Sequence, residues 1–478
     1  MELVQGTPAS RPVVPIAILV ASLGVLTTSV VTGAPVRVIA PIICLVVLIA
    51  AMYRVALSWT SLVSLVIGVI LFIPIRRYTL PFQLPFSMEP YRLVVLVVAT
   101  GWLISLLVDP RVKTRSTGFG APLLLFTAAA LGSIIVNPAM VATVQSHVIK
   151  QLSYFASFVI VIALIASLVR THEQIDTTVK VLVSCGSVVA FFALIQAETG
   201  YNLFDHLASF LPFLKVAYIP DSPLRGGRLR AYASAQHAIE LGAMLVMLVP
   251  LAGYLARRTG RKIWLGAGVL LLMGALATLS RTSMLMLLIV VIVFLILRPK
   301  QVRRLWPALI PLMAAVHIAI PGTIGTLKDS FFPKGGLIAE QSANAGYKGS
   351  GRLADVSPTL EKLKREPLLG GGYGTRISDG PDANAPILDD QWLSTLVETG
   401  VIGLLAWVWI FARAIRRFGG EARRDLGDRG WFLASITASA AAFAIGMATF
   451  DAFSFTQCML VLFILLALGH AMLRLRPE

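Results

Sequence analysis

The sequence is poor in charged residues. Of its 478 residues, only 14% are charged and 57% are hydrophobic, and the mean hydropathy is +0.81. Soluble domains carry about a quarter charged residues, so this composition excludes an ordinary soluble protein and indicates a polytopic membrane protein.

Cysteines, metal-binding patterns and repeats are also scarce. Cys44, Cys185 and Cys458 lie far apart in apolar runs, and their number is odd, so we expect inert thiols and no disulfide. The hydrophilic loops contain no metal-ligand spacing and no nucleophile-elbow motif. We therefore expect no metal and no cofactor. The sequence has no internal repeat, which counts against a transporter built from repeated halves.

Positive charge is the abundant kind. Lys and Arg number 41 against 24 Asp and Glu, which gives a net charge of +17. On a soluble protein this excess would indicate nucleic acid. In a membrane protein, basic loops instead mark the cytoplasmic side or bind anionic substrates and lipid headgroups. We expect the lipid bilayer as a partner and no nucleic acid.

Apolar runs long enough to cross a bilayer recur along the whole chain. The sequence predicts an all-α polytopic membrane protein with about 12–14 transmembrane helices. Residues 263–297 are interrupted only by Ser280-Arg281-Thr282-Ser283, which predicts a helical hairpin. The expected spans lie near 13–32, 38–53, 55–74, 93–108, 121–136, 153–170, 177–198, 237–256, 263–280, 282–297, 305–322, 393–412, 431–450 and 455–472.

The basic loops predict the orientation of these spans. The loops around 257–262, 298–304 and 413–429 and the C-terminal tail are each separated by two spans, so all of them fall on one side. The positive-inside rule assigns that side to the cytoplasm, and both termini with it. The expected divisions are N-terminal spans with external basic loops (1–236), spans with the Ser-Arg hairpin (237–322), a large external loop containing short helices (323–392) and C-terminal spans (393–478).

The predicted external loops carry more arginine than the positive-inside rule allows. A shared anionic ligand explains this excess, because guanidinium groups suit bidentate contacts with phosphate. The alternatives are ion pairs within the loops, contact with anionic lipid headgroups and, for Arg281, a side chain that extends to the membrane surface. The arginines are Arg76, Arg77, Arg92, Arg225, Arg228, Arg230, Arg281, Arg352 and Arg376.

The stretch EPLLGGGYGTR, residues 366–376, resembles a phosphate-binding loop at first sight. It follows no strand and lacks the Lys-Ser/Thr pair of a nucleotide-binding P-loop. We expect a turn that leaves a short helix begun by Ser357-Pro358, in which the backbone N–H groups of Gly372 and Gly374 can also bind an anion.

Two groups of polar residues open apolar spans. In ILDDQWLSTLVETGVIGLL, Asp390 or Glu398 could act as a general base on a sugar hydroxyl. Alternatively, acidic residues there favour a helix N-terminus through the helix dipole. His237 and Glu240 open the span after the Arg225–Arg230 loop and could line an external pocket, although a histidine there can also be a structural helix-start residue.

The order of these features resembles the O-antigen ligase and O-antigen polymerase family of bacterial membrane glycosyltransferases. The matching pieces are LSRTSMLMLLI, then GRLADVSPTLEKLKREPLLGGGYGT in the large loop, then DDQWLSTLVETGVIGLLAWVWIF. They lie within about 225–412, less than half of the chain, and the N-terminal spans match only in hydropathy.

This resemblance implies a helical membrane glycosyltransferase of the C-type fold in the cytoplasmic membrane, acting in polysaccharide assembly. Its donor would be a glycan on undecaprenyl pyrophosphate presented in the outer leaflet. A glycan or another acceptor would receive the sugar, and other polysaccharide assembly proteins would be partners. Arg230, Arg281 and Arg352 would face the pyrophosphate, joined by Arg376, and no metal is expected.

One departure bears on the type of transfer. Ligases of this family have a histidine in the large external loop, and residues 323–392 contain none. Asp389-Asp390-Gln391 is closer to the polymerase pattern, so the sequence favours polymerisation of repeat units. The alternatives are transfer of a finished glycan by a ligase, a transporter or flippase of lipid-linked oligosaccharide, and a non-catalytic scaffold.

Overall fold

The structure is a computed structural model. It describes residues 58–81, 88–109, 112–220, 224–225, 227–305, 307, 366–377, 384–385 and 388–476. The chain divides into two units, Met1–Val63 and Ser64–Glu478, and the candidate site lies in the second.

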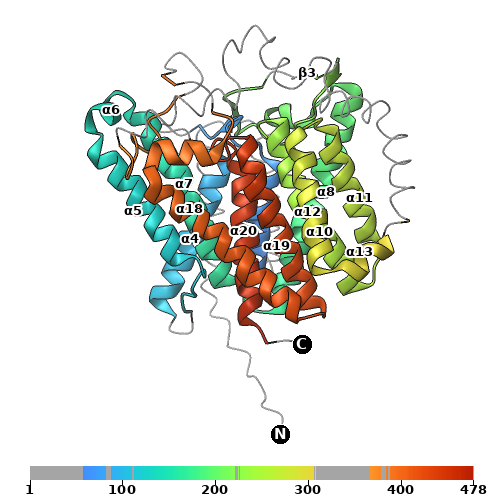
Figure 1. Cartoon of the computed structure of the whole chain (residues 1–478). Coiled ribbons are helices and arrows are strands. Elements are labelled where there is room, and N and C mark those ends of the chain that lie inside the picture. The colour runs from blue at the N-terminus through green and yellow to red at the C-terminus, as the bar shows by residue number, and fades with distance from the viewer. Residues whose placement is uncertain are drawn as a thin grey trace, which may run out of the picture. The chain divides into compact units, whose positions relative to one another are not determined.

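Helices make up most of the second unit (Figure 1). Seven helices among the described residues are long and apolar enough to cross a membrane, namely α4 (Pro90–Val108), α7 (Gln145–Leu168), α8 (His172–Thr199), α10 (Ala238–Thr259), α18 (Gln391–Arg424), α19 (Asp428–Gly446, continued by η3, Met447–Thr449) and α20 (Thr456–Arg474). Shorter apolar helices are α3 (Trp59–Phe72), α5 (Gly120–Val136), α11 (Ile263–Ala277) and α12 (Arg281–Leu297). The expected all-α membrane fold is confirmed.

These helices match the apolar runs of the sequence. The predicted hairpin over 263–297 is present as α11 and α12, separated at Thr278–Ser280. The expected spans near 13–32 and 38–53, and nearly all of the one near 305–322, lie outside the described residues. Short elements complete the set: α6 (Pro138–Thr143), η1 (Leu203–Asp205), α9 (Leu207–Phe210) and α13 (Pro299–Leu305).

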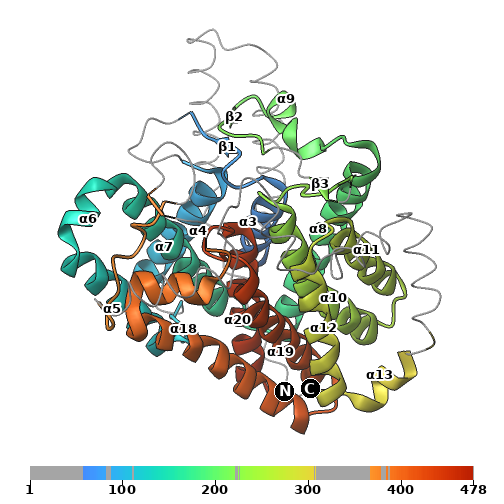
Figure 2. The same cartoon turned by 45° about the horizontal axis from the view of Figure 1, so that its top comes forward.

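Helix α20 is the most buried of these membrane helices. It is apolar on all sides, as a helix surrounded by protein must be, and it packs against α7, α10, α18 and α19. Both views show it between α7 and α10 (Figures 1 and 2). The start of α20 therefore lies among the ends of the helices that pack against it.

Two short antiparallel ribbons lie in the connections between helices. Strand β1 (Tyr78–Thr79) pairs with β2 (Lys215–Val216), and β3 (Leu224–Arg225) pairs with β4 (Arg228–Leu229). They join the residues after α3 and before α10 at one end of the helices (Figure 2). This end also holds the α11–α12 turn and the start of α18, and we call it the arginine end.

Helix α18 is kinked. Gly400 has φ 65° and ψ −168°, so residues before and after it form two helices that meet at an angle. This conformation is open to glycine because it has no Cβ. The kink ends the first part of α18 at Thr399, the residue after Glu398.

Candidate active site

Three arginines converge on the turn between α11 and α12. We call Arg225, Arg230 and Arg281 the first arginine cluster. Arg225 Nη1 donates to the Leu279 carbonyl at 2.7 Å, and Arg230 Nε donates to the Thr278 carbonyl at 3.2 Å. The last carbonyls of a helix lack partners and carry partial negative charge, so they attract these cations.

Arg230 is the most buried member of this cluster. Its side chain is 7% exposed, and within the described residues nothing accepts a hydrogen bond from its Nη2. Burial, with the nearby charges of Arg225 and Arg281, lowers the pKa of Arg230 to about 10. The group therefore stays charged at neutral pH, in a place where an anion would be stabilising.

Arg281 occupies the first position of α12. Ser280 caps this helix, and its hydroxyl accepts a hydrogen bond from Ser283 N–H. Arg281 is partly buried and is an electrostatic neighbour of Arg230. A helix N-terminus and two further arginines therefore surround one small region, which suits a bound phosphate group.

Not every predicted arginine lies in this cluster. Arg228 forms an ion pair with Glu198 of α8 at 3.6 Å. Arg77 is buried, pairs with Asp205 at 2.7 Å and donates to the carbonyls of Ala233 and Ala235. Arg77 therefore forms an ion pair within the loops, which was the alternative to binding a ligand. Arg352 lies outside the described residues.

His237 and Glu240 lie at the start of α10. His237 caps the helix, because its Nδ1 accepts from Ile239 N–H at 3.2 Å, and its ring stacks on Phe455. Burial and the charges of Arg230 and Arg225 lower the pKa of His237 to about 4, so the ring is neutral at pH 7.

Glu240 connects two helices. Its Oε2 accepts from Gln236 N–H at 2.8 Å and its Oε1 from Gln457 N–H at 2.8 Å, at the first turn of α20. A carboxylate at this position satisfies backbone donors that the helix leaves open. Its contacts hold the start of α20 against α10, and its role in binding substrate stays a prediction.

The glycine-rich stretch is bound to the kink in α18. We call Pro367–Gly371 the latch. Three backbone hydrogen bonds join the latch to α18: Gly371 N–H to Val397 O at 2.8 Å, Val401 N–H to Pro367 O at 3.0 Å and Ile402 N–H to Leu368 O at 3.3 Å. In addition, Asn137 Nδ2 donates to the Gly370 carbonyl at 2.9 Å. The latch supplies partners for backbone groups that the kink exposes.

Tyr373 anchors the residues after the latch. Its side chain is 2% exposed and packs edge-on against Phe126, Phe155 and Phe453, with ring centroids 6.2–6.4 Å away. Gly372 and Gly374 flank it with φ 111° and 70°, so the chain turns here, whereas the short helix expected before this turn, begun by Ser357-Pro358, lies outside the described residues. Their binding of an anion stays a prediction.

Two carboxylates lie beside this turn. Glu398 Oε2 accepts from Gly374 N–H at 3.2 Å, and Asp451 and Arg376 are its electrostatic neighbours. Asp451, between η3 and α20, accepts from the Ser454 hydroxyl at 2.7 Å. Burial raises the pKa of Asp451, against the lowering effect of its hydrogen bonds to Ser454. Partly buried carboxylates near a cationic cluster are suited to proton transfer.

Asp390 has a capping role. Its Oδ1 accepts from Trp392 N–H at 2.8 Å and from Leu393 N–H at 3.2 Å, which begins α18. Asp389 lies within electrostatic reach of Asp451. The contacts of Asp390 agree with the helix-terminus alternative, and its role as a base stays a prediction.

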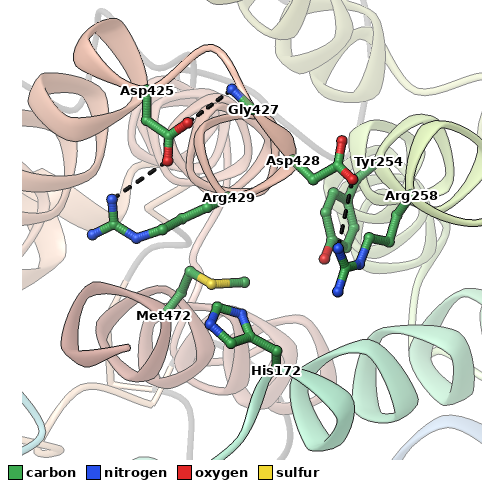
Figure 3. A pocket seen from close by; sticks show the side chains of 8 residues that line it. All are labelled: His172, Tyr254, Arg258, Asp425, Gly427, Asp428, Arg429 and Met472. Carbon is green, nitrogen blue, oxygen red and sulfur yellow. Dashed lines mark hydrogen bonds and ion pairs between the residues drawn. The ribbon is translucent and has the colours of Figure 1, made fainter. Parts of the chain in front are cut away.

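A small pocket lies at the opposite end of α10 (Figure 3). It has a volume of about 140 Å³ and contains both cations and carboxylates. Arg258 pairs with Asp428 at 3.7 Å and Arg429 with Asp425 at 3.5 Å. The 22-residue helix places this pocket about 33 Å from His237. Its charges neutralise one another, so it ties helix ends together and is separate from the candidate site.

The sequence interpretation missed Asp451, Lys150 and Tyr154. Asp451 is the one acidic residue in ATFDAFSFTQ, the short segment between the last two apolar runs. An acidic residue between two membrane spans could have indicated a functional site. Lys150 and Tyr154 lie on α7, which begins at Gln145 instead of near residue 153, so Lys150 belongs to the helix and not to a loop. Both α7 residues lie near Arg76 and Arg92.

The comparisons with known proteins agree with the resemblance seen in the sequence. Residues 266–408 match the family model described as O-antigen ligase. This range includes α12 with Arg281, Glu398, and the start of α18. No curated protein matches the chain. Residues 266–408 are therefore similar to the O-antigen ligase family, and this similarity supports a transfer of glycans in general terms.

Proposed function

We propose that this protein polymerises oligosaccharide units carried on undecaprenyl pyrophosphate, at the external face of the bacterial cytoplasmic membrane and without a metal ion. The observation that carries the proposal is the first arginine cluster, in which Arg281 lies within the residues that match the O-antigen ligase model and Arg225 and Arg230 precede them. Its most buried member, Arg230, has a donor with no partner in the described part of the chain.

The chemistry requires stabilisation of a leaving group. An acceptor hydroxyl oxygen attacks the anomeric carbon of the donor, the bond from that carbon to the pyrophosphate oxygen breaks, and the lipid pyrophosphate departs with the electron pair. Fixed guanidinium groups of Arg230 and Arg281 stabilise the charge that develops there. The hydroxyl proton passes to Glu398, which Gly374 orients.

The proposed orientation follows the basic loops. The arginine end faces outside, the ends that carry Arg257–Lys262 and Arg413–Arg429 face the cytoplasm, and both termini are cytoplasmic. Arg352 and Arg376 of the loop 323–392 would join the pyrophosphate contacts. The predicted division of the chain at 236, 322 and 392 is part of the same proposal.

Transfer of a finished glycan is the second candidate, because the matching family model is described as O-antigen ligase. The number of transfers distinguishes the two. Purified protein in lipid vesicles receives lipid-linked repeat units in the presence of EDTA. A ladder of chain lengths supports metal-independent polymerisation, whereas a single added unit or glycan supports a ligase and overturns the proposal.

Arg281→Ala tests the assignment of the site in the same assay. We expect the rate of polymer formation to fall about 100-fold, since one preorganised donor to a developing anion is worth that much. Arg423→Ala is the matched control, because Arg423 is exposed in the last turn of α18, far from the cluster. Wild-type polymer from Arg281→Ala would contradict the assignment.

A further inference from the structure

A second group of basic residues lies at the arginine end, on the other side of α20. We call Arg76, Arg92 and Lys150 the second basic cluster. They come from the residues after α3, from the first turn of α4 and from α7. Helices α7 and α10 both pack on α20, and Figure 2 shows α20 between them. The two clusters therefore flank the start of α20.

One tyrosine holds two of these cations. The guanidinium centres of Arg92 and Arg76 lie 4.3 and 4.9 Å from the ring centroid of Tyr154. Arg76 Nε also donates to the Tyr154 hydroxyl at 3.2 Å. Arg76 has φ 67°, a strained conformation for a residue other than glycine, which the packing must maintain. The protein thus holds two like charges close together on one aromatic ring.

The charges within the cluster do not balance. Glu89 forms an ion pair with Arg92 at 3.2 Å and accepts from the Tyr154 hydroxyl at 3.0 Å. No carboxylate of the described segments lies within ion-pair distance of Arg76 or of Lys150. Lys150 is nevertheless within electrostatic reach of both arginines. Within the described segments, the ion pairs of these three cations thus involve one close carboxylate, Glu89.

Two further carboxylates act on Arg76 from greater distance. Glu240 and Asp451 are its electrostatic neighbours. Glu240 is occupied by backbone N–H groups at the starts of α10 and α20, and Asp451 is hydrogen-bonded to Ser454. Partly buried cations of this kind are stabilised by an anion that accepts several hydrogen bonds, such as a pyrophosphate.

Polymerisation of lipid-linked units requires two pyrophosphates at the same membrane surface. The donor loses its lipid pyrophosphate, whereas the acceptor keeps its own while its sugar hydroxyl attacks. We propose that the second basic cluster binds the pyrophosphate of the lipid-linked acceptor, while the first arginine cluster binds that of the donor. This inference rests on the proposed function. Asp451 is an electrostatic neighbour of both Arg76 in the second basic cluster and Glu398.

Lys150→Gln and Arg76→Gln test the inference. Both side chains are partly exposed, and the buried Tyr154 hydroxyl, which Arg76 contacts, keeps its hydrogen bond to Glu89 when Arg76 is replaced. Arg92 is unsuitable, because its removal would leave Glu89 buried without a counterion. Lys180→Gln is the matched control, since Lys180 is also a partly exposed lysine in an apolar helix.

Two substrate analogues separate the two sites in reconstituted vesicles. One is a lipid-pyrophosphate oligosaccharide with a capped non-reducing end, which can only donate. The other has a methylene group in place of the scissile oxygen, which makes the linkage an unreactive phosphonate, so that it can only accept. We expect each variant to raise KM for the accepting analogue about tenfold and to leave KM for the capped donor unchanged. A KM increase for the donor, or none for either analogue, overturns the inference.

Binding stoichiometry distinguishes failure of the inference from failure of the proposed function. Wild-type protein should bind two molecules of a phosphonate-linked, non-reacting lipid glycan per chain, and Lys150→Gln should bind one with the original affinity and the second about tenfold more weakly. One molecule per wild-type chain overturns the second site. Two molecules per chain without a product ladder leave the second site in place and overturn polymerisation.

Discussion

The contact between the latch and the kink of α18 makes Gly400→Ala a decisive change. A Cβ at Gly400 would lie 2.2 Å from the Leu368 carbonyl oxygen and 2.5 Å from Leu369 N. Both are backbone atoms that cannot rotate away, so the latch must leave its position. Alanine also strains the backbone at φ 65° and ψ −168°. We therefore expect Gly400→Ala to detach Pro367–Gly371 from α18.

The magnitude follows from the three backbone hydrogen bonds that the latch forms with α18. At about 1 kcal/mol each, they stabilise the docked latch by about 3 kcal/mol. This corresponds to roughly a 100-fold change in the population of the detached form. Hydrogen exchange should therefore speed up by that factor at the amides of Gly371, Val401 and Ile402.

Hydrogen exchange with mass spectrometry in lipid nanodiscs measures this effect. Gly420→Ala is the control within the same helix, because a Cβ there has nothing within 4 Å. It should leave exchange at the latch unchanged. Polymer formation by Gly400→Ala should also fall, since Gly374 could no longer hold Glu398. Wild-type exchange at the three amides in Gly400→Ala would refute the reasoning.

Three further predictions concern the base, the histidine and the orientation. Glu398→Gln should lower kcat about 100-fold or more in the ladder assay while donor binding is retained, because a glutamine has the same shape but accepts no proton; an unchanged kcat would assign the base elsewhere. The pKa of His237 is about 4 when folded and 6.5 in the reference state, so the unfolded chain binds the proton first as pH falls. Stability should thus decrease between about pH 6.5 and 4 by on the order of 3 kcal/mol, and His237→Asn should remove that part of the slope in thermal unfolding, whereas an identical slope in the variant would contradict the pKa shift. For orientation, Ala345→Cys in a cysteine-free background should react with an impermeant maleimide on intact cells; reaction only after lysis would reverse the proposed topology.

The sequence by itself determined which segments are membrane helices. Hydrophobicity is a local property that adds along the chain, so the runs near 177–198, 237–256 and 455–472 predicted α8, α10 and α20 nearly to their ends. The break at Ser280–Ser283 likewise predicted the α11–α12 hairpin, because a straight helix of that length would exceed the bilayer. The family resemblance rested on motifs of the same local kind.

Only the tertiary structure decided which polar residues meet. Tyr373 enters an aromatic core formed by Phe126 and Phe155, which lie 247 and 218 positions before it, and Phe453, which lies 80 positions after it. The glycines of EPLLGGGYGTR are needed because two backbones touch at Gly370 and Gly400, a contact that no local pattern encodes. The hydrogen bond between Arg76 and Tyr154 likewise depends on how α7 packs against its neighbours. Contacts between residues far apart in the sequence are set by the shape complementarity of the packed helices.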